Sequence, residues 1–155
     1  MDISRIDARL RDLGITLPTP TAPVANYVPF VVSGNLLFVS GQLPMGPSGL
    51  VKGKLGAELD AAAGNAAARL CAINLIAQAR AALDDDLDRV RRVVKLVAFV
   101  CCTDGFVDQP KVANGASDLF VEVFGDAGRH ARSAVGTNAL PLGAAVEVEA
   151  IFEFE

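Results

Sequence analysis

The chain has 155 residues, with 14 Lys and Arg against 18 Asp and Glu, which gives a formal net charge of -4. A hydrophobic content of 52% and a charged content of 21% exclude a disordered chain and a coiled coil. The acidic balance argues against a phosphate-binding surface, and aromatic residues at 6% are too few for a single-strand nucleic-acid platform. We expect one domain over residues 1–155, in which residues 1–24 are an N-terminal extension and Pro-rich lead-in.

The three cysteines are Cys71, Cys101 and Cys102, and their spacing fits neither a disulfide framework nor a metal site. We therefore expect reduced, buried thiols and no metal. The N-terminus lacks the basic segment and apolar run of a secretory leader. Polar and charged residues interrupt every long apolar stretch, so no membrane segment is expected. These features predict a soluble, cytoplasmic protein.

The first part of the chain predicts a short helix, a lead-in and a hairpin. Residues 3–13 have amphipathic spacing, and three prolines within residues 17–23 favour extended structure. Residues 27–32 and 36–40 are strand-like, and a Gly-Asn turn signal separates them. Residues 41–54 are rich in Gly and Pro and predict a loop.

The middle of the chain predicts two helices around one strand. Asp60 is a suitable N-cap for a helix that ends near Leu83, and many of its apolar positions are Ala, which allows close packing on a sheet. Residues 93–101 are almost continuously apolar, which indicates a strand buried on both faces. The second helix has Pro110 in its first turn and Gly125 at its end.

The last part of the chain predicts two strands. Residues 132–139 are strand-like, and a turn at residues 140–143 follows. In residues 146–155 apolar side chains alternate with positions that are mostly Glu, which is typical of a strand with one buried face and one acidic face. The order is β-β-α-β-α-β-β, an α+β fold with a mixed sheet and two helices on one face. The acidic face must meet water, a ligand or another subunit.

Arg132 and Glu147 are the candidate functional side chains of these two strands. A guanidinium held at a strand end suits bidentate binding of a carboxylate, whereas the alternative is a solvated surface arginine. A carboxylate on the face away from the core suits a general base, whereas the alternative is an ordinary strand-face residue.

A hairpin at residues 140–143 places Arg132 opposite roughly Phe152, with Glu147 on the order of 16 Å away along the strand. Two groups so far apart could hardly share a small ligand within one chain. Across a subunit interface they could do so. We therefore expect a site to which two copies of the chain contribute.

Other candidates carry weaker signals. Tyr27 is the only tyrosine and follows the Pro-rich lead-in, where an aromatic is more often a capped surface residue than a ligand contact. His130 has no Ser or Cys nucleophile at motif spacing, so we expect a surface turn residue. Three consecutive carboxylates at residues 84–86 lack the alternate spacing of a calcium loop and predict a solvated turn.

Several motifs together resemble the Rid family, also called YjgF or L-PSP endoribonuclease-like. They are Ser40-Gly41-Gln42-Leu43-Pro44 after a hairpin, Arg132-Ser133-Ala134-Val135, Leu140-Pro141, and Val146-Glu147-Val148-Glu149-Ala150. The resemblance covers roughly residues 25–154, and the C-terminal motif is quite specific.

The resemblance implies a chorismate-mutase-like fold assembled as a homotrimer with three clefts between subunits. It implies hydrolytic deamination of enamine or imine intermediates, such as 2-aminoacrylate, to a 2-keto acid and ammonia, without metal or cofactor. In this scheme Arg132 binds the substrate carboxylate and Glu147 orients or activates water. Tyr27, Asn114 and the backbone at Ala134 line the cleft.

The sequence also departs from the best-known enamine deaminases. It has a longer N-terminal extension, another loop after Pro44, Ala134 where many members have Cys, and one additional residue between Asn114 and Arg132. These differences indicate a distinct, longer subgroup. Two alternatives stay open: a non-catalytic module that binds a small carboxylate or a partner protein, and a ribonuclease, which the acidic charge and the lack of a paired His disfavour.

Overall fold

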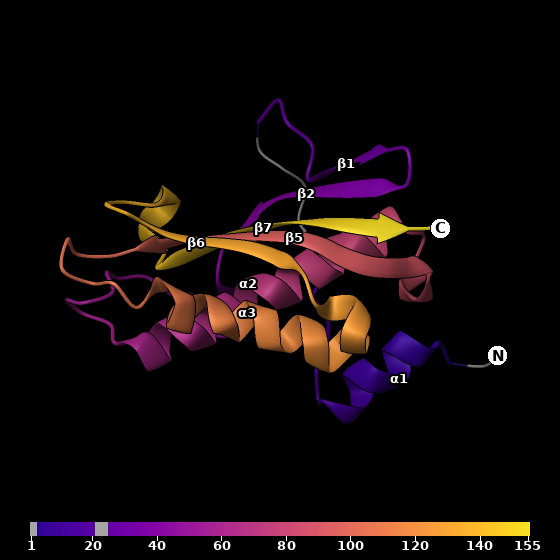
Figure 1. Ribbon diagram of the computed structural model, residues 1–155, viewed down its shortest axis with the longest axis horizontal. Helices are drawn as coiled ribbons and strands as arrows, with labels where there is room; N and C mark the ends of the chain where they lie inside the picture. The colour runs from indigo at the N-terminus through magenta and orange to yellow at the C-terminus, as the bar shows by residue number, and fades with distance from the viewer. Residues whose placement is uncertain (1–2, 21–24) are drawn as a thin grey trace.

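The computed structural model describes residues 3–20 and 25–155 (Figure 1). The part of the predicted lead-in at residues 21–24 lies outside them. The strands are β1 (Phe30–Ser33), β2 (Leu36–Gln42), β3 (Met45–Gly46), β4 (Gly49–Leu50), β5 (Val90–Cys101), β6 (Ala131–Thr137) and β7 (Val146–Phe154). The helices are α1 (Arg5–Asp12), α2 (Ala61–Ala82) and α3 (Gln109–Phe124), with short 3-10 turns η1 (Leu87–Arg89), η2 (Gly125–Gly128) and η3 (Pro141–Gly143).

The main sheet is mixed and has the strand order β1-β2-β7-β5-β6. All neighbours are antiparallel except β5 and β6, which are parallel. Helices α2 and α3 lie side by side along one face, and α1 packs at the end of this layer (Figure 1). We call the other face of the sheet the open face. The predicted α+β fold and its element order are thus confirmed.

The two long helices begin and end where the sequence predicts. The Asp60 side chain accepts a hydrogen bond of 2.9 Å from the Ala63 N–H and so caps α2. Helix α3 has Pro110 in its first turn, and Gly125 follows its last residue with a φ of 65°. The helices approach so closely that a Cβ at Gly115 would clash with the Asn65 carbonyl.

Helix α1 adds a third helix to the two that cover the sheet. Ile6 and Leu10 are buried in the core. The Asp88 carboxylate accepts hydrogen bonds from the Arg5 and Ile6 N–H groups, both at 2.9 Å. Because the first N–H groups of a helix lack partners within it, this contact attaches α1 to η1.

Strand β7 confirms the alternation seen in the sequence. Its buried residues are Val146, Val148, Ala150 and Phe152, and they face the helices. Glu147, Glu149 and Glu153 point to the open face. Although β7 is the last strand in the chain, it lies in the middle of the sheet between β2 and β5.

The predicted hairpin at residues 140–143 is wrong. Strand β6 pairs with β5, not with β7, and Arg132 lies opposite Leu96 rather than Phe152. Residues 138–145 carry the chain past β5, and η3 lies within this connection. Turn residues permit a reversal of the chain, but they do not choose the strand that β6 joins. Helix α3 connects β5 to β6 along the chain and packs on the sheet, which allows β6 to pair with β5 in parallel.

Three smaller expectations also need correction. Strand β5 is fully buried only on its helix side, because Lys95 and Phe99 on the open face stay partly accessible. The first strand begins at Phe30, so Tyr27 precedes it. The loop over residues 41–54 contains the small β3–β4 ladder, and the Asn74 amide of α2 donates to the Leu43 and Met45 carbonyls at 3.0 Å.

The cysteines are free and buried, as predicted. None of the helices in residues 3–20 and 25–155 is both long and apolar enough to cross a membrane.

Candidate functional site

Arg132 lies on the edge strand β6, on the face that α3 covers. Its Nη1 donates to Asn114 Oδ1 at 2.8 Å and to Ser117 Oγ at 3.1 Å. Asn114 and Ser117 are three residues apart, so they lie on the same side of α3. Within residues 3–20 and 25–155 Arg132 forms no salt bridge. The structure thus places Asn114 beside Arg132 and leaves the arginine charge unneutralised.

The contacts of Arg132 continue to His130. The Ser117 hydroxyl lies 2.9 Å from His130 Nε2, and His130 Nδ1 lies 2.6 Å from the Gly128 carbonyl oxygen. The imidazole also packs edge-on against the buried Phe120 ring, with centroids 5.7 Å apart. The expectation of a surface turn residue at His130 is therefore wrong, because its ring is partly buried and both its nitrogens are hydrogen-bonded.

Sequence reasoning missed Ser117 and misjudged His130. The available signal was the spacing of Asn114 and Ser117 on one polar side of α3, which marks that side as facing something other than the core. A single His in a turn has no periodicity, so nothing local linked it to a serine 13 residues earlier.

Glu147 lies on β7 and points to the open face, against a bulge in the neighbouring strand. Val39 pairs with Ala150, but Gln42 pairs with Val148, so β2 holds one more residue than β7 between these pairs. Gly41 lies in this bulge, where a Cβ would approach Glu147 Cδ to 2.9 Å. A glycine there leaves room for the carboxylate, which a larger residue would displace.

The environment of Glu147 raises the pKa of its carboxyl above the ordinary value. Burial of the partly covered carboxylate is the main cause, and the negative charge of Glu149 adds to it. A carboxyl group with a raised pKa accepts a proton more readily than an ordinary glutamate does, which suits general acid–base chemistry.

Arg132 and Glu147 lie far apart within one chain. Glu147 pairs with Phe99 of β5, whereas Arg132 pairs with Leu96, and the two side chains point to opposite faces of the sheet. Two strand spacings and three residues along the strand separate their backbones by about 14 Å. The structure therefore does not bring the two groups together in one chain.

Tyr27 and Ala134 lie at opposite edges of the sheet. Tyr27 is 56% exposed and precedes β1, and the neighbouring Val28 carbonyl accepts a hydrogen bond of 3.0 Å from the Ser40 hydroxyl. Ala134 lies on the other edge strand, β6, two residues beyond Arg132, and pairs with Ala98 of β5. Four strand spacings, about 19 Å, separate the two edges. The predicted residues thus form three groups: one around Arg132, one at Glu147, and Tyr27.

One cavity lies on the open face and measures about 260 Å³. Phe38, Lys95, Val97 and Glu149 contribute to its lining. Phe38 is 41% exposed and Val31 beside it 51% exposed. Large apolar side chains that stay accessible in one region mark a surface suited to association.

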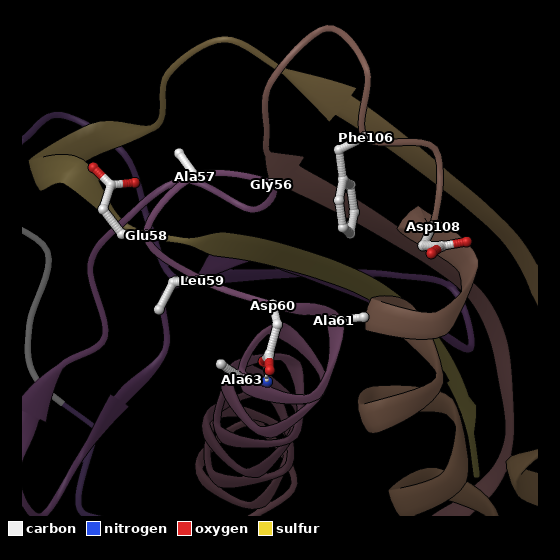
Figure 2. Close-up of a pocket in the computed structure, with 9 residues that line it drawn as sticks. All are labelled: Gly56, Ala57, Glu58, Leu59, Asp60, Ala61, Ala63, Phe106 and Asp108. Atoms are coloured by element: carbon white, nitrogen blue, oxygen red, sulfur yellow. Dashed lines mark hydrogen bonds between the residues drawn. The ribbon is translucent and has the colours of Figure 1, made fainter.

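A second cavity of about 580 Å³ lies beside the first turns of α2 and α3 (Figure 2). Its carboxylates already stabilise local structure: Glu58 accepts from the Lys54 N–H at 2.9 Å, Asp60 caps α2, and Asp108 lies 3.5 Å from Lys111 Nζ. Figure 2 shows Asp60 turned toward its own helix and the Phe106 ring facing the space. Neither Arg132 nor Glu147 lines this cavity.

Comparisons with known proteins agree with this architecture. A family model described as "YjgF/chorismate mutase-like, putative endoribonuclease" matches residues 7–154. Protein TCP17 of Trypanosoma cruzi is 55% identical over 151 residues, which cover 96% of this chain and 94% of that protein.

Two solved structures share the fold across nearly the whole chain. Protein Atu1372 of Agrobacterium tumefaciens, described as of unknown function, is 52% identical with a TM-score of 0.90, covering 97% of this chain and 92% of that one. A Shewanella oneidensis protein described as a putative endoribonuclease is 34% identical with a TM-score of 0.93, covering 97% of this chain and 100% of that one. The match of the family model over almost the full length, together with these relatives, shows that the chain belongs to the YjgF/chorismate mutase-like family, also known as the Rid family.

Proposed function

We propose that this protein hydrolyses imine or enamine forms of small 2-amino acids to the 2-keto acid and ammonia, in a cleft formed between copies of the chain. Water adds to the imine carbon, the C–N bond breaks, and nitrogen leaves as ammonia, so no oxidant or reductant is required. The observation that carries the proposal is that one chain presents both an unneutralised guanidinium at Arg132 and a carboxyl of raised pKa at Glu147.

Arg132 binds the carboxylate of the substrate. Its Nη1 is held by Asn114 and Ser117, and it has no salt bridge within the described residues, so its charge is free for an anion. Charge-assisted hydrogen bonds from a guanidinium match a carboxylate in geometry as well as in charge. This contact selects substrates that carry a carboxylate and fixes their reactive carbon.

Glu147 moves the protons. As a carboxylate it accepts a proton from water as the water oxygen bonds to the imine carbon. The protonated imine thereby becomes a neutral carbinolamine, which takes that proton back from Glu147 on its nitrogen. Glu147 then accepts the hydroxyl proton as the carbonyl forms and the C–N bond breaks, and this proton finally passes to the released ammonia. A carboxyl with a raised pKa suits both steps, because it takes up a proton more readily than an ordinary glutamate and can return it.

The cleft requires more than one copy of the chain. Arg132 and Glu147 point to opposite faces, and Tyr27 lies at the edge opposite β6, so no single chain surrounds a small substrate with all three. The accessible apolar side chains Phe38, Val31 and Val135 and the two edge strands suit contacts between copies. A homotrimer with three equivalent clefts, in which Arg132 of one copy meets Glu147 of the next, satisfies these constraints.

The test is the rate of ammonia release from imino acids that an amino-acid oxidase generates in place. We expect wild type to exceed the spontaneous rate, and Arg132→Ala and Glu147→Gln each to lose at least about tenfold of that acceleration. Arg129→Ala and Glu153→Gln are matched controls, because Arg129 is an exposed arginine shortly before β6 and Glu153 is another glutamate of β7.

Two results would contradict the proposal. Binding of a small carboxylate at Arg132 without acceleration for any imino acid would instead indicate a non-catalytic binding module. Cleavage of RNA that Arg132→Ala abolishes, without imine hydrolysis, would indicate the activity that the family description names.

A further inference from the structure

The hydrogen bonds from Arg132 through Ser117 to His130 have one consistent direction when the His130 ring is neutral. The Gly128 carbonyl can only accept, so His130 Nδ1 carries the proton and donates at 2.6 Å. In the neutral ring Nε2 is then an acceptor, and the Ser117 hydroxyl donates to it at 2.9 Å. The Ser117 oxygen is left to accept from Arg132 Nη1 at 3.1 Å. Each group thus has one role.

The surroundings of His130 keep its ring neutral. Burial lowers the pKa of His130, the hydrogen bond to Gly128 opposes this, and the positive charge of Arg132 lowers it further. The groups that face the ring are the Ser117 hydroxyl and Phe120 from α3, the Gly128 carbonyl from η2, and the Arg132 guanidinium from β6. A neutral imidazole is the form that can accept from Ser117.

The arrangement determines which edge of the guanidinium is free. Nη1 has two N–H bonds, and the contacts with Asn114 and Ser117 use both of them. The Nε–Nη2 edge therefore remains for a ligand, and this edge binds a carboxylate through two parallel hydrogen bonds. Because β6 is an edge strand, no neighbouring strand would otherwise hold the long arginine side chain in place.

We propose that Ser117 and His130 are positioning residues that fix the Arg132 guanidinium with its Nε–Nη2 edge toward the substrate carboxylate. This inference rests on the proposed function, because it assumes that Arg132 binds a carboxylate. His130 acts through Ser117 and touches no reacting atom. The role explains why a half-buried imidazole and a hydroxyl converge on one nitrogen of an arginine that forms no salt bridge within the described residues.

The binding test uses pyruvate, a small 2-keto acid, as the probe, and calorimetry to measure its Kd. We expect Ser117→Ala and His130→Gln to raise the Kd and the KM for the imine by about 10-fold or more, with a smaller change in kcat. Ser117→Thr retains the hydroxyl and restores the Kd to near the wild-type value. Asp118→Ala, an exposed neighbour on α3, is the matched control.

A spectroscopic measurement tests the direction of the hydrogen bonds without activity. The chain has a single His, so the ¹⁵N spectrum of the imidazole contains one pair of signals. We expect a protonated Nδ1 and an unprotonated Nε2 at neutral pH in the wild type. The opposite tautomer would overturn the inference, because Ser117 would then accept from His130 rather than donate to it.

The outcomes separate the two proposals. Pyruvate binding in the wild type with an unchanged Kd in both Ser117→Ala and His130→Gln would overturn the positioning role and leave the proposed function standing. Absence of binding of both pyruvate and imine in the wild type would overturn the proposed function and this inference with it. Thermal unfolding of each variant identifies any loss of binding that follows from loss of the fold.

Discussion

Arg132 and Glu147 belong to strands on either side of β5 and point to opposite faces of the sheet. A small substrate that contacts both must therefore lie between two copies of the chain. Two inactive variants should then complement each other. When Arg132→Ala and Glu147→Gln chains are unfolded together and refolded as a mixture, an interface that takes Arg132 from one variant and Glu147 from the other is intact.

We expect such mixed assemblies to recover up to about a quarter of wild-type imine hydrolysis, since random mixing supplies both intact residues at one interface in four. Each variant refolded alone is the control and should stay inactive. Light scattering gives the mass of the assembly, for which we expect three chains. Full inactivity of a mixture of that mass would show that one copy supplies both residues.

Gly41→Ala should displace the Glu147 carboxylate, because the new Cβ would lie against it. We expect loss of most imine hydrolysis and a decrease of less than about 1 kcal/mol in the free energy of unfolding, because the contacted atoms belong to a flexible side chain that can turn away. Gly105→Ala is the control, since no atom lies within 4 Å of a Cβ there. Urea unfolding and ammonia release measure the two effects. Full activity in Gly41→Ala would mean that Glu147 is not required where the structure places it.

Activity should rise with pH as the Glu147 carboxyl loses its proton, because only the carboxylate accepts a proton from water. The pKa of this group lies above the ordinary value through burial and through Glu149. Glu149→Gln removes one cause, so we expect the acidic limb of the kcat profile to move to lower pH. Glu153→Gln should leave it in place. If the acidic limb shifts equally in both variants, the group that titrates in this limb is not Glu147.

The same pKa shift predicts the sign of a stability effect. A carboxyl whose pKa is higher in the folded than in the unfolded chain favours the fold when protonated, and this stabilisation is lost as the pH rises through the folded pKa. Replacing Glu147 by Gln removes that loss. The free energy of unfolding should therefore fall less in Glu147→Gln than in wild type between acidic and neutral pH, as measured by urea unfolding at each pH.

Gly115→Ala should destabilise the protein and weaken carboxylate binding together. The added methyl group meets the backbone carbonyl of Asn65, which cannot rotate away, and α3 carries both Asn114 and Ser117. We expect a loss of roughly 1–3 kcal/mol and a weaker affinity for pyruvate. Gly64→Ala meets only the side chains of Leu55 and Val112 and should cost less. Equal stability in the two variants would show that α2 and α3 separate easily.

Local patterns in the sequence predicted most of the fold. The cap at Asp60, the limits of α3 and the two faces of β7 depend on near neighbours in the chain, and each is as expected. The partner of β6 was missed because turn residues near Leu140 permit a reversal but do not choose a neighbour. A parallel pair depends on an intervening helix, which is a property of the whole fold.

In the candidate site, too, the features that depend on local motifs were predicted and those that depend on the whole fold were not. Arg132, Asn114 and Glu147 follow from motifs, and the structure joins Arg132 to Asn114 directly. The distance inferred from a hairpin had a wrong premise, yet the separation of Arg132 from Glu147 stands, because the two residues lie on different faces. The contact of His130 with Ser117 could not be predicted, because it depends on how closely the segment after η2 approaches α3 in the folded chain. No periodicity in the sequence indicates that approach.

The central position of β7 sets a condition on how the chain is made. While residues 146–154 are still within the ribosome, β2 and β5 have no strand between them, and each presents an unpaired backbone edge. Nascent chains that stall before this point cannot complete the sheet, however well their helices form. Premature stops late in the reading frame should therefore produce aggregation-prone fragments rather than folded proteins of lower stability.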